Sequence, residues 1–157
     1  MLSIFYACGL RRNEGHHLSV DDINFDRRLM YVRKGKGYKE RLVPFTKKTS
    51  RILSDYVFDG RRELLKGAKH LTFFISCKQG KPVSENILWR RLKRLQESSK
   101  LDSLRNKTIG LHTLRHSIAT HLLQEGMKLE QISRFLGHSS LVSTQVYTHL
   151  AEEHEQL

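Results

Sequence analysis

Strand-like hydrophobic runs occur in only one stretch of this chain, residues 23–45, and most of the remainder has the hydrophobic spacing of helices. The glycine-containing sequence Gly35-Lys36-Gly37-Tyr38 separates the last two runs and is typical of a turn between antiparallel strands. The fold class that follows is α+β, mainly α, with a small antiparallel sheet of three strands. The three runs lie at residues 23–25, 29–33 and 41–45.

Helical patterns flank this sheet on both sides. Residues 1–8 are apolar and end at Gly9, which predicts the tail of a helix followed by a glycine cap. After Ser84, a plausible N-cap, Leu88, Leu92 and Leu95 share one face of a helix and arginines occupy the other. Further helices are expected at residues 13–18, in the segment that begins after Thr46, and at 112–125, 129–136 and 140–151. The sequence does not decide whether the short apolar segment 73–75 is a helix or a strand.

The length of 157 residues corresponds to one domain, which can bury roughly 68–70% of its unfolded surface without disulfides or metal. No apolar run approaches the 18–20 residues or so that a membrane span needs, and the first ten residues lack a signal-peptide pattern. We therefore expect no membrane partner and a cytoplasmic location. Cys8 and Cys77 stand alone in the sequence, so we expect two reduced thiols.

The charge distribution indicates a polyanionic partner. The chain has 28 lysines and arginines against 16 acidic residues, a formal charge of +12. Such a surplus destabilises the folded chain by self-repulsion, and a partner of opposite charge relieves that repulsion. The cations cluster at residues 33–48 and 90–107, whereas acidic residues dominate after Glu125. One part of the molecule is therefore expected to face nucleic acid.

One expected helix carries residues suited to phosphate chemistry. His112 and Arg115 are i, i+3 neighbours beside an apolar stripe, so that an imidazole and a guanidinium can converge on one ligand. His112 and His116 could alternatively form a zinc pair, but the pattern lacks a glutamate and a clear third ligand, so we expect no metal. The apolar stripe consists of Leu111, Leu114, Ile118 and Leu122.

Four sequence blocks in order resemble the catalytic domain of tyrosine recombinases, the phage integrase family with its Xer-type members. The resemblance spans residues 5–150 and implies the helical catalytic domain of that family over residues 1–157, with its N-terminal part and the core-binding domain absent. The blocks are Gly9-Leu10-Arg11 with Glu14, Gly35-Lys36-Gly37 with Lys39-Glu40-Arg41, His-Thr-Leu-Arg-His at 112–116, and Leu136-Gly137-His138 with Tyr147.

The resemblance also implies a function: DNA strands are cleaved and rejoined through a covalent 3′-phosphotyrosyl intermediate, as in site-specific recombination or integration of mobile elements. The reaction would need neither metal nor other cofactor, and no carboxylate cluster suited to Mg²⁺ occurs among the residues concerned. The implied roles are nucleophile for Tyr147, phosphate clamp for Arg11 and Arg115, proton donor for Lys36, acid–base transfer for His112 and a phosphate hydrogen bond for His138.

The chemistry requires these residue types independently of the family. Only about 0.1% of a free tyrosine is ionised at pH 7, so the nucleophile needs a cationic or proton-accepting neighbourhood. Two arginines can neutralise the charge of a pentacoordinate phosphorane. Lys39 competes with Lys36 for the role of acid, and Arg12 stands next to Arg11, so both of these alternatives remain open.

Double-stranded DNA is the expected partner, bound by a homo-oligomer, a tetramer in the family. Only ten residues follow Tyr147, which leaves tetramer assembly and the activity of this chain alone open. The alternative functions are a DNA-binding module that does not cleave, and relaxation of supercoils as in type-IB topoisomerases. The residues predicted to contact DNA are Lys34, Lys39, Arg41, Arg90, Arg91 and Arg94.

Overall fold

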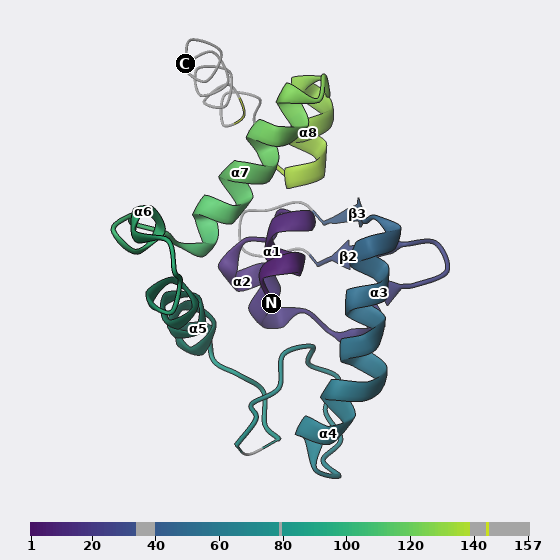
Figure 1. Cartoon of the computed structure of the whole chain (residues 1–157). Helices are drawn as coiled ribbons and strands as arrows, with labels where there is room; N and C mark the ends of the chain where they lie inside the picture. The colour runs from purple at the N-terminus through teal and green to yellow at the C-terminus, as the bar shows by residue number, and fades with distance from the viewer. Residues whose placement is uncertain (34–39, 79, 139–143, 145–157) are drawn as a thin grey trace.

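The computed structural model of this chain describes residues 1–33, 40–78, 80–138 and 144. Two short helices precede a small sheet, and helices follow it (Figure 1). The elements are α1 (Leu2–Ala7), α2 (Arg12–His17), the 3₁₀ turn η1 (Val20–Asp22), β1 (Ile23–Asn24), β2 (Leu29–Val32), β3 (Arg41–Pro44), α3 (Lys47–Asp55), the π-helical turn η2 (Tyr56–Gly60), α4 (Arg61–Leu65), α5 (Glu85–Glu97), α6 (Asp102–Arg105), α7 (Leu111–Gln124) and α8 (Leu129–Leu136).

The three strands form an antiparallel sheet in the order β1-β2-β3, which confirms the predicted meander. Met30 pairs with Val43 in register, and both side chains are fully buried on one face of the sheet. Tyr31 and Leu42 pair on the opposite face and are exposed, as expected for a sheet with one solvated side. The predicted turn at residues 35–38 lies outside the described residues.

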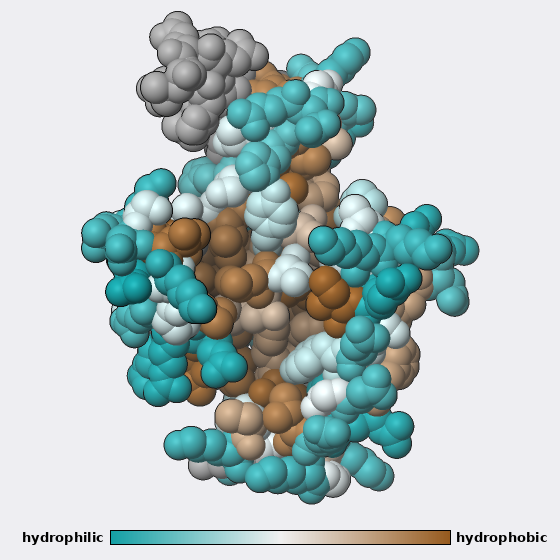
Figure 2. Space-filling model, viewed as in Figure 1, coloured by the Kyte–Doolittle hydropathy of each residue, from teal (hydrophilic) through white to brown (hydrophobic). Residues whose placement is uncertain are grey.

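Helix α1 lies at the centre of the molecule and packs against α3 and α7 (Figure 1). Its residues Ile4 and Phe5 are buried, and the core around them includes Leu10, Met30 and Phe73. Figure 2 shows hydrophobic side chains gathered in the middle of this face, with hydrophilic ones around them. A helix of only six residues is held in place by this packing rather than by its own propensity.

The helical predictions that fall within the described residues are confirmed, with one difference in α5. Leu88 and Leu92 are buried as predicted, but Leu95 is 42% exposed. Near the end of α5 the buried side chain is Gln96, whose amide donates to the backbone carbonyl of Leu104 at 2.8 Å. The inward face of α5 therefore turns polar where it meets α6. The third helix expected near the C-terminus, at 140–151, lies outside the described residues except for Thr144, which is helical and buried.

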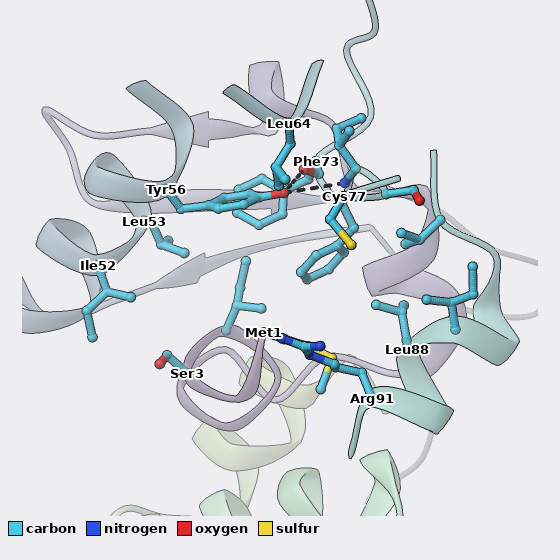
Figure 3. A pocket seen from close by; sticks show the side chains of 16 residues that line it. Met1, Ser3, Ile52, Leu53, Tyr56, Leu64, Phe73, Cys77, Leu88 and Arg91 are labelled. Atoms are coloured by element: carbon cyan, nitrogen blue, oxygen red, sulfur yellow. Dashed lines mark hydrogen bonds between the residues drawn. The ribbon is translucent and has the colours of Figure 1, made fainter. Parts of the chain in front are cut away.

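Segment 73–75, whose type the sequence left undecided, is buried, and Ile75 forms an isolated β-bridge with Pro82. It borders a cavity of 440 Å³ between α1, α3 and α5 (Figure 3). In this cavity the Tyr56 hydroxyl donates to the Phe73 carbonyl at 2.9 Å, and Arg91 lies at the wall near Met1. None of the described helices is long and apolar enough to cross a membrane.

Candidate functional site

Arg11 and Arg115, separated by most of the chain, meet at the C-terminal end of α8. Arg11 precedes α2, and its guanidinium donates to the carbonyls of Leu136 at 3.4 Å and Gly137 at 3.2 Å. Arg115, from the middle of α7, donates to Leu136 at 2.5 Å and to Gly9 at 2.5 Å. The two arginines therefore converge on one carbonyl oxygen, that of Leu136.

The backbone at Gly9 allows this convergence. Gly9 has a φ of +55°, a left-handed conformation that ends α1. A Cβ atom at this position would approach Leu136 Cδ2 to 2.7 Å. The glycine therefore lets the turn that carries Arg11 lie directly against α8.

Glu14 supplies the negative charge around which the arginines gather. Its carboxylate accepts from Arg11 at 2.9 Å and from Arg41 at 2.8 and 3.0 Å, and lies 3.8 Å from Arg115. The Glu14 side chain is only 6% exposed. We call Arg11, Glu14, Arg41 and Arg115 the arginine cluster.

The position of Glu14 follows from its place in α2. As the third residue of that helix, it accepts the backbone N–H of Arg11 at 2.8 Å, which caps the helix. Burial by itself would raise the pKa of Glu14, but the hydrogen bonds and positive charges of Arg41 and Arg11 outweigh it and lower the pKa to about 2. Glu14 is therefore ionised at neutral pH.

His138 stands next to the cluster, directly after α8. The left-handed φ of Gly137, +66°, ends the helix, and the N–H of His138 donates back to the Ser133 carbonyl at 3.0 Å. Its ring Nδ1 lies 2.9 Å from the hydroxyl of Thr144. Burial, followed by the positive charges of Arg115, Arg11 and Arg41, lowers the pKa of His138 to about 4. The ring is therefore neutral at pH 7 and can donate one hydrogen bond.

His112 and His116 lie on the exposed side of α7, whereas Arg115 between them points into the protein. Burial and the charges of His112 and Arg115 lower the pKa of His116. Within the ranges that the structure covers, no group of three or more His, Cys, Asp or Glu side chains could hold a metal ion. His112, one turn before Arg115, remains a predicted proton-transfer group.

The structure separates Arg12 from Arg11. Arg12 points outward, is half exposed and pairs with Glu85 of α5 at 3.1 Å, whereas Arg11 belongs to the arginine cluster. Among the predicted DNA contacts, Arg90, Arg91 and Arg94 are exposed on α5, although Arg91 also lines the cavity of Figure 3. The predicted residues Lys34, Lys36, Lys39 and Tyr147 lie outside the described residues.

Arg41, which we expected among the DNA contacts, has a different position. Its side chain is 6% exposed and its guanidinium donates to Glu14 and, at 2.8 Å through Nε, to the Phe135 carbonyl. Strand β3 alternates, and Arg41 occupies an inward position in register with the buried Val32. The sequence pattern around Lys36 gave no sign that this arginine has a buried partner.

Two further roles were not evident from the sequence. Glu14 was part of a motif, but its position three residues after Arg11 predicts only a helix cap, not a carboxylate shared by three arginines. Thr144 gave no signal in the sequence, because nothing there indicates that its hydroxyl lies beside the His138 ring.

The chemical capacity of the site is anion binding. Three guanidiniums surround one carboxylate in the cluster, and a neutral imidazole lies next to them. Planar guanidiniums bind phosphate oxygens with paired hydrogen bonds. This arrangement suits a phosphodiester that gains negative charge during a reaction.

Comparison with known proteins gives close relatives. The chain is 41% identical to tyrosine recombinase XerD of Pseudomonas putida over 152 residues. This match covers 97% of this chain and 49% of that protein. It is 39% identical to XerD of Proteus mirabilis, over 98% of this chain and 47% of that protein. The chain thus spans about half the length of these relatives.

The fold is also that of solved recombinases. The crystal structure of XerA recombinase matches with a TM-score of 0.82 and 28% identity over 98% of this chain and 55% of that one. XerH bound to its difH substrate, in a post-cleavage complex, matches with a TM-score of 0.77 and 27% identity over 99% of this chain and 42% of that one. The model of the phage integrase family matches residues 1–154. This chain therefore belongs to the phage integrase family, whose catalytic fold it has.

Proposed function

We propose that residues 1–157 form the catalytic part of a site-specific DNA recombinase, which cleaves and rejoins strands through a 3′-phosphotyrosyl link at Tyr147. The observation that carries this proposal is the convergence of Arg11 and Arg115 on the Leu136 carbonyl beside His138. These residues come from three distant parts of the chain. A merely structural role would not require the arginines of two distant segments to meet at one carbonyl with a neutral histidine next to them.

In the proposed reaction, Arg11 and Arg115 bind the non-bridging oxygens of the scissile phosphate. The Tyr147 oxygen forms a bond to phosphorus while the bond to the 5′-oxygen breaks. Lys36 gives a proton to that leaving oxygen, and His112 takes the phenolic proton. His138 donates a hydrogen bond to the phosphate without adding a charge. Attack of another 5′-hydroxyl reverses these steps and rejoins the strand.

The comparisons support DNA as the substrate. Relatives of this chain are named tyrosine recombinases, and XerH matches it in a complex with its palindromic difH substrate. Arg90, Arg91 and Arg94 on α5 offer exposed positive charge for the duplex. We further propose that the protein acts as an oligomer on DNA in the prokaryotic cytosol, with a tetramer as the assembly that exchanges two duplexes.

The test is formation of a covalent protein–DNA adduct. The chain is incubated with a nicked duplex that carries its site, selected from randomised duplexes by binding, and adducts that survive SDS are counted. The wild type should form the adduct in the presence of EDTA, and Tyr147→Phe should not. Tyr31→Phe is the matched control, because Tyr31 is exposed on β2 and bonds Glu40.

Three outcomes separate the alternatives. An adduct in the wild type and the Tyr31 variant alone supports the proposal. DNA binding without any adduct would indicate a module that binds but does not cleave. Relaxation of supercoiled plasmid without exchange between two sites would indicate a topoisomerase-like activity.

A further inference from the structure

The cavity between α1, α3 and α5 takes no part in the proposed reaction and shares no residue with the arginine cluster. Its volume of 440 Å³ falls within the range of roughly 300–1,000 Å³ that is usual for small-molecule pockets. Much of its wall belongs to the packed core: Ile4, Leu53, Phe73, Val83 and Leu88 are each at most 7% exposed. A small ligand therefore needs no repacking of the core to enter.

Two hydroxyl groups of this cavity already have partners within the protein. The Tyr56 hydroxyl donates to the Phe73 carbonyl at 2.9 Å and accepts the N–H of Ile75 at 3.4 Å. The Ser76 hydroxyl accepts the N–H of Lys78 at 3.4 Å. Most of the remaining wall is aliphatic or aromatic (Figure 3). A ligand that fills the cavity is therefore mainly apolar.

Arg91 gives the cavity its electrostatic character. Of the 16 lining residues, all within the described part of the chain, Arg91 has the only charged side chain, and none is acidic. It projects from α5 beside Met1 (Figure 3). None of the ion pairs between described residues includes Arg91. An apolar wall with a single guanidinium attracts a molecule that combines an apolar body with one negative charge.

We propose that this cavity binds a small apolar carboxylate, whose tail lies between α1, α3 and α5 and whose carboxylate accepts hydrogen bonds from the Arg91 guanidinium. The planar guanidinium matches a carboxylate in geometry, with two parallel hydrogen bonds. A carboxylate carries the one charge that a single arginine balances, whereas a phosphate monoester carries about two. An ammonium group would be repelled by Arg91, and an uncharged head group would form only weaker hydrogen bonds with it.

The test compares three probes of equal chain length: octanoate, 1-octanol and octylammonium. Their affinities are measured without DNA, from the methyl NMR signals of Ile4 and Leu88 in the 157-residue chain. Octanoate should bind roughly tenfold more tightly than 1-octanol, the effect of one hydrogen-bonded pair with a charged group. Octylammonium should bind more weakly than either.

Arg91→Gln tests which residue recognises the charge. It should weaken octanoate binding roughly tenfold and leave 1-octanol binding unchanged, because the apolar wall stays intact. The matched control is Arg51→Gln. Arg51 is exposed on α3 next to the lining residue Ile52 but does not line the cavity, so its loss should change neither affinity. A general effect of lost positive charge would move both variants alike.

Alkylation of Cys77 locates the bound ligand. Cys77 is exposed and lines the cavity, whereas Cys8 is buried, and burial raises the pKa of Cys8 to about 12. Iodoacetamide should therefore modify Cys77 selectively, which mass spectrometry follows over time. Saturating octanoate should slow this reaction severalfold in the wild type, and the same concentration should protect Cys77 less in Arg91→Gln.

Equal affinities for the three probes, or octanoate binding that is as tight in Arg91→Gln as in the wild type, would overturn the inference. Octanoate binding that leaves the alkylation of Cys77 unchanged would also overturn it, because the ligand would then lie elsewhere. Circular dichroism verifies that both variants are folded, and the comparison of the three probes needs only the wild type. Absence of a covalent DNA adduct would count against the proposed function alone, since these measurements involve no DNA.

Discussion

At the scale of single residues, Thr144 decides how the ring of His138 is presented. Its hydroxyl lies 2.9 Å from Nδ1, and Thr144 is fully buried. When that hydroxyl donates to Nδ1, the ring proton resides on Nε2, the nitrogen that can then donate to a phosphate oxygen. The hydrogen bond from the Thr144 hydroxyl to Nδ1 then sets both the tautomer and the direction of the His138 ring.

We therefore expect Thr144→Val to slow cleavage by about tenfold, the effect of losing one buried hydrogen bond. Thr144→Ser, which keeps the hydroxyl, should retain most of the rate. Single-turnover cleavage of the nicked duplex measures both. Equal rates for the valine variant and the wild type would show that Thr144 does not orient His138.

Two residues of the site also predict that acid destabilises the protein. The pKa of His138 falls from its ordinary value of 6.5 to about 4 in the folded state, and that of Glu14 from 4.5 to about 2. The unfolded chain therefore binds a proton on His138 between pH 6.5 and 4, and another on Glu14 between pH 4.5 and 2, before the folded state does. Stability should be lost as the pH falls through each window.

Urea unfolding midpoints measured from pH 7 to pH 2 test this expectation. Glu14→Gln should lower the midpoint at pH 7 and flatten its decline between pH 4.5 and 2, because the carboxylate no longer titrates. A wild-type midpoint that stays constant from pH 7 to 4, or a Glu14→Gln curve parallel to that of the wild type, would contradict the assignment.

At the scale of elements, the contact between α1 and α2 places Arg11. These helices flank the turn that carries it, and Gly15 of α2 packs directly on the ring of Phe5 in α1. A Cβ atom on Gly15 would come within 2.3 Å of that ring. The two helices can approach each other this closely because position 15 has no side chain.

Gly15→Ala should accordingly destabilise the fold by about 1–3 kcal/mol, the usual cost of overpacking a core. Phe5→Leu in the same chain should recover part of the loss. Gly60→Ala is the control, because its Cβ would meet nothing closer than 4.0 Å and its backbone is helical, so we expect a gain of about 0.5–1 kcal/mol. Urea unfolding compares the three, and a neutral Gly15→Ala would contradict the close contact.

Most elements could be predicted from the sequence because their signals are local. Glycine caps, the Thr46 cap and the three hydrophobic runs each report on a few neighbouring residues, and the structure has a helix or strand at each. The prediction that Leu95 is buried was wrong because its environment depends on α6, which contacts α5 only in the folded chain. The buried position of Arg41 was missed for the same reason, because its partners come from α2 and α8.

The site was predictable only as a set of residue types. Family resemblance grouped Arg11, Arg115 and His138, and the structure brings these three together. Glu14 joins them through contacts that span more than a hundred residues, which no local pattern encodes. The depressed pKa of His138 likewise arises from three arginines that converge only after folding.

At the scale of the whole molecule, exposed positive charge should govern affinity for DNA. The chain carries a formal charge of +12, and Arg94 is exposed on α5. Each phosphate neutralised contributes about −0.9 to the slope of log K against log salt concentration. Arg94→Gln should therefore make the slope of duplex binding shallower by about one.

Fluorescence anisotropy of a labelled duplex across a salt series gives this slope. Arg62→Gln, a variant that removes the same charge from an exposed position on α4, should leave it unchanged. Equal slopes for the Arg94 variant and the wild type would remove α5 from the DNA interface and leave the positive charge elsewhere to account for binding.

The most direct test of the account is to identify which amino acid becomes linked to DNA. The SDS-stable adduct is digested with trypsin and nuclease, and mass spectrometry locates the residual nucleotide. The account predicts a single modified residue, Tyr147, joined to a 3′-phosphate, and loss of the adduct in Arg11→Gln and Arg115→Gln. A nucleotide on another residue, a link to a 5′-phosphate, or an undiminished adduct in both arginine variants would contradict it.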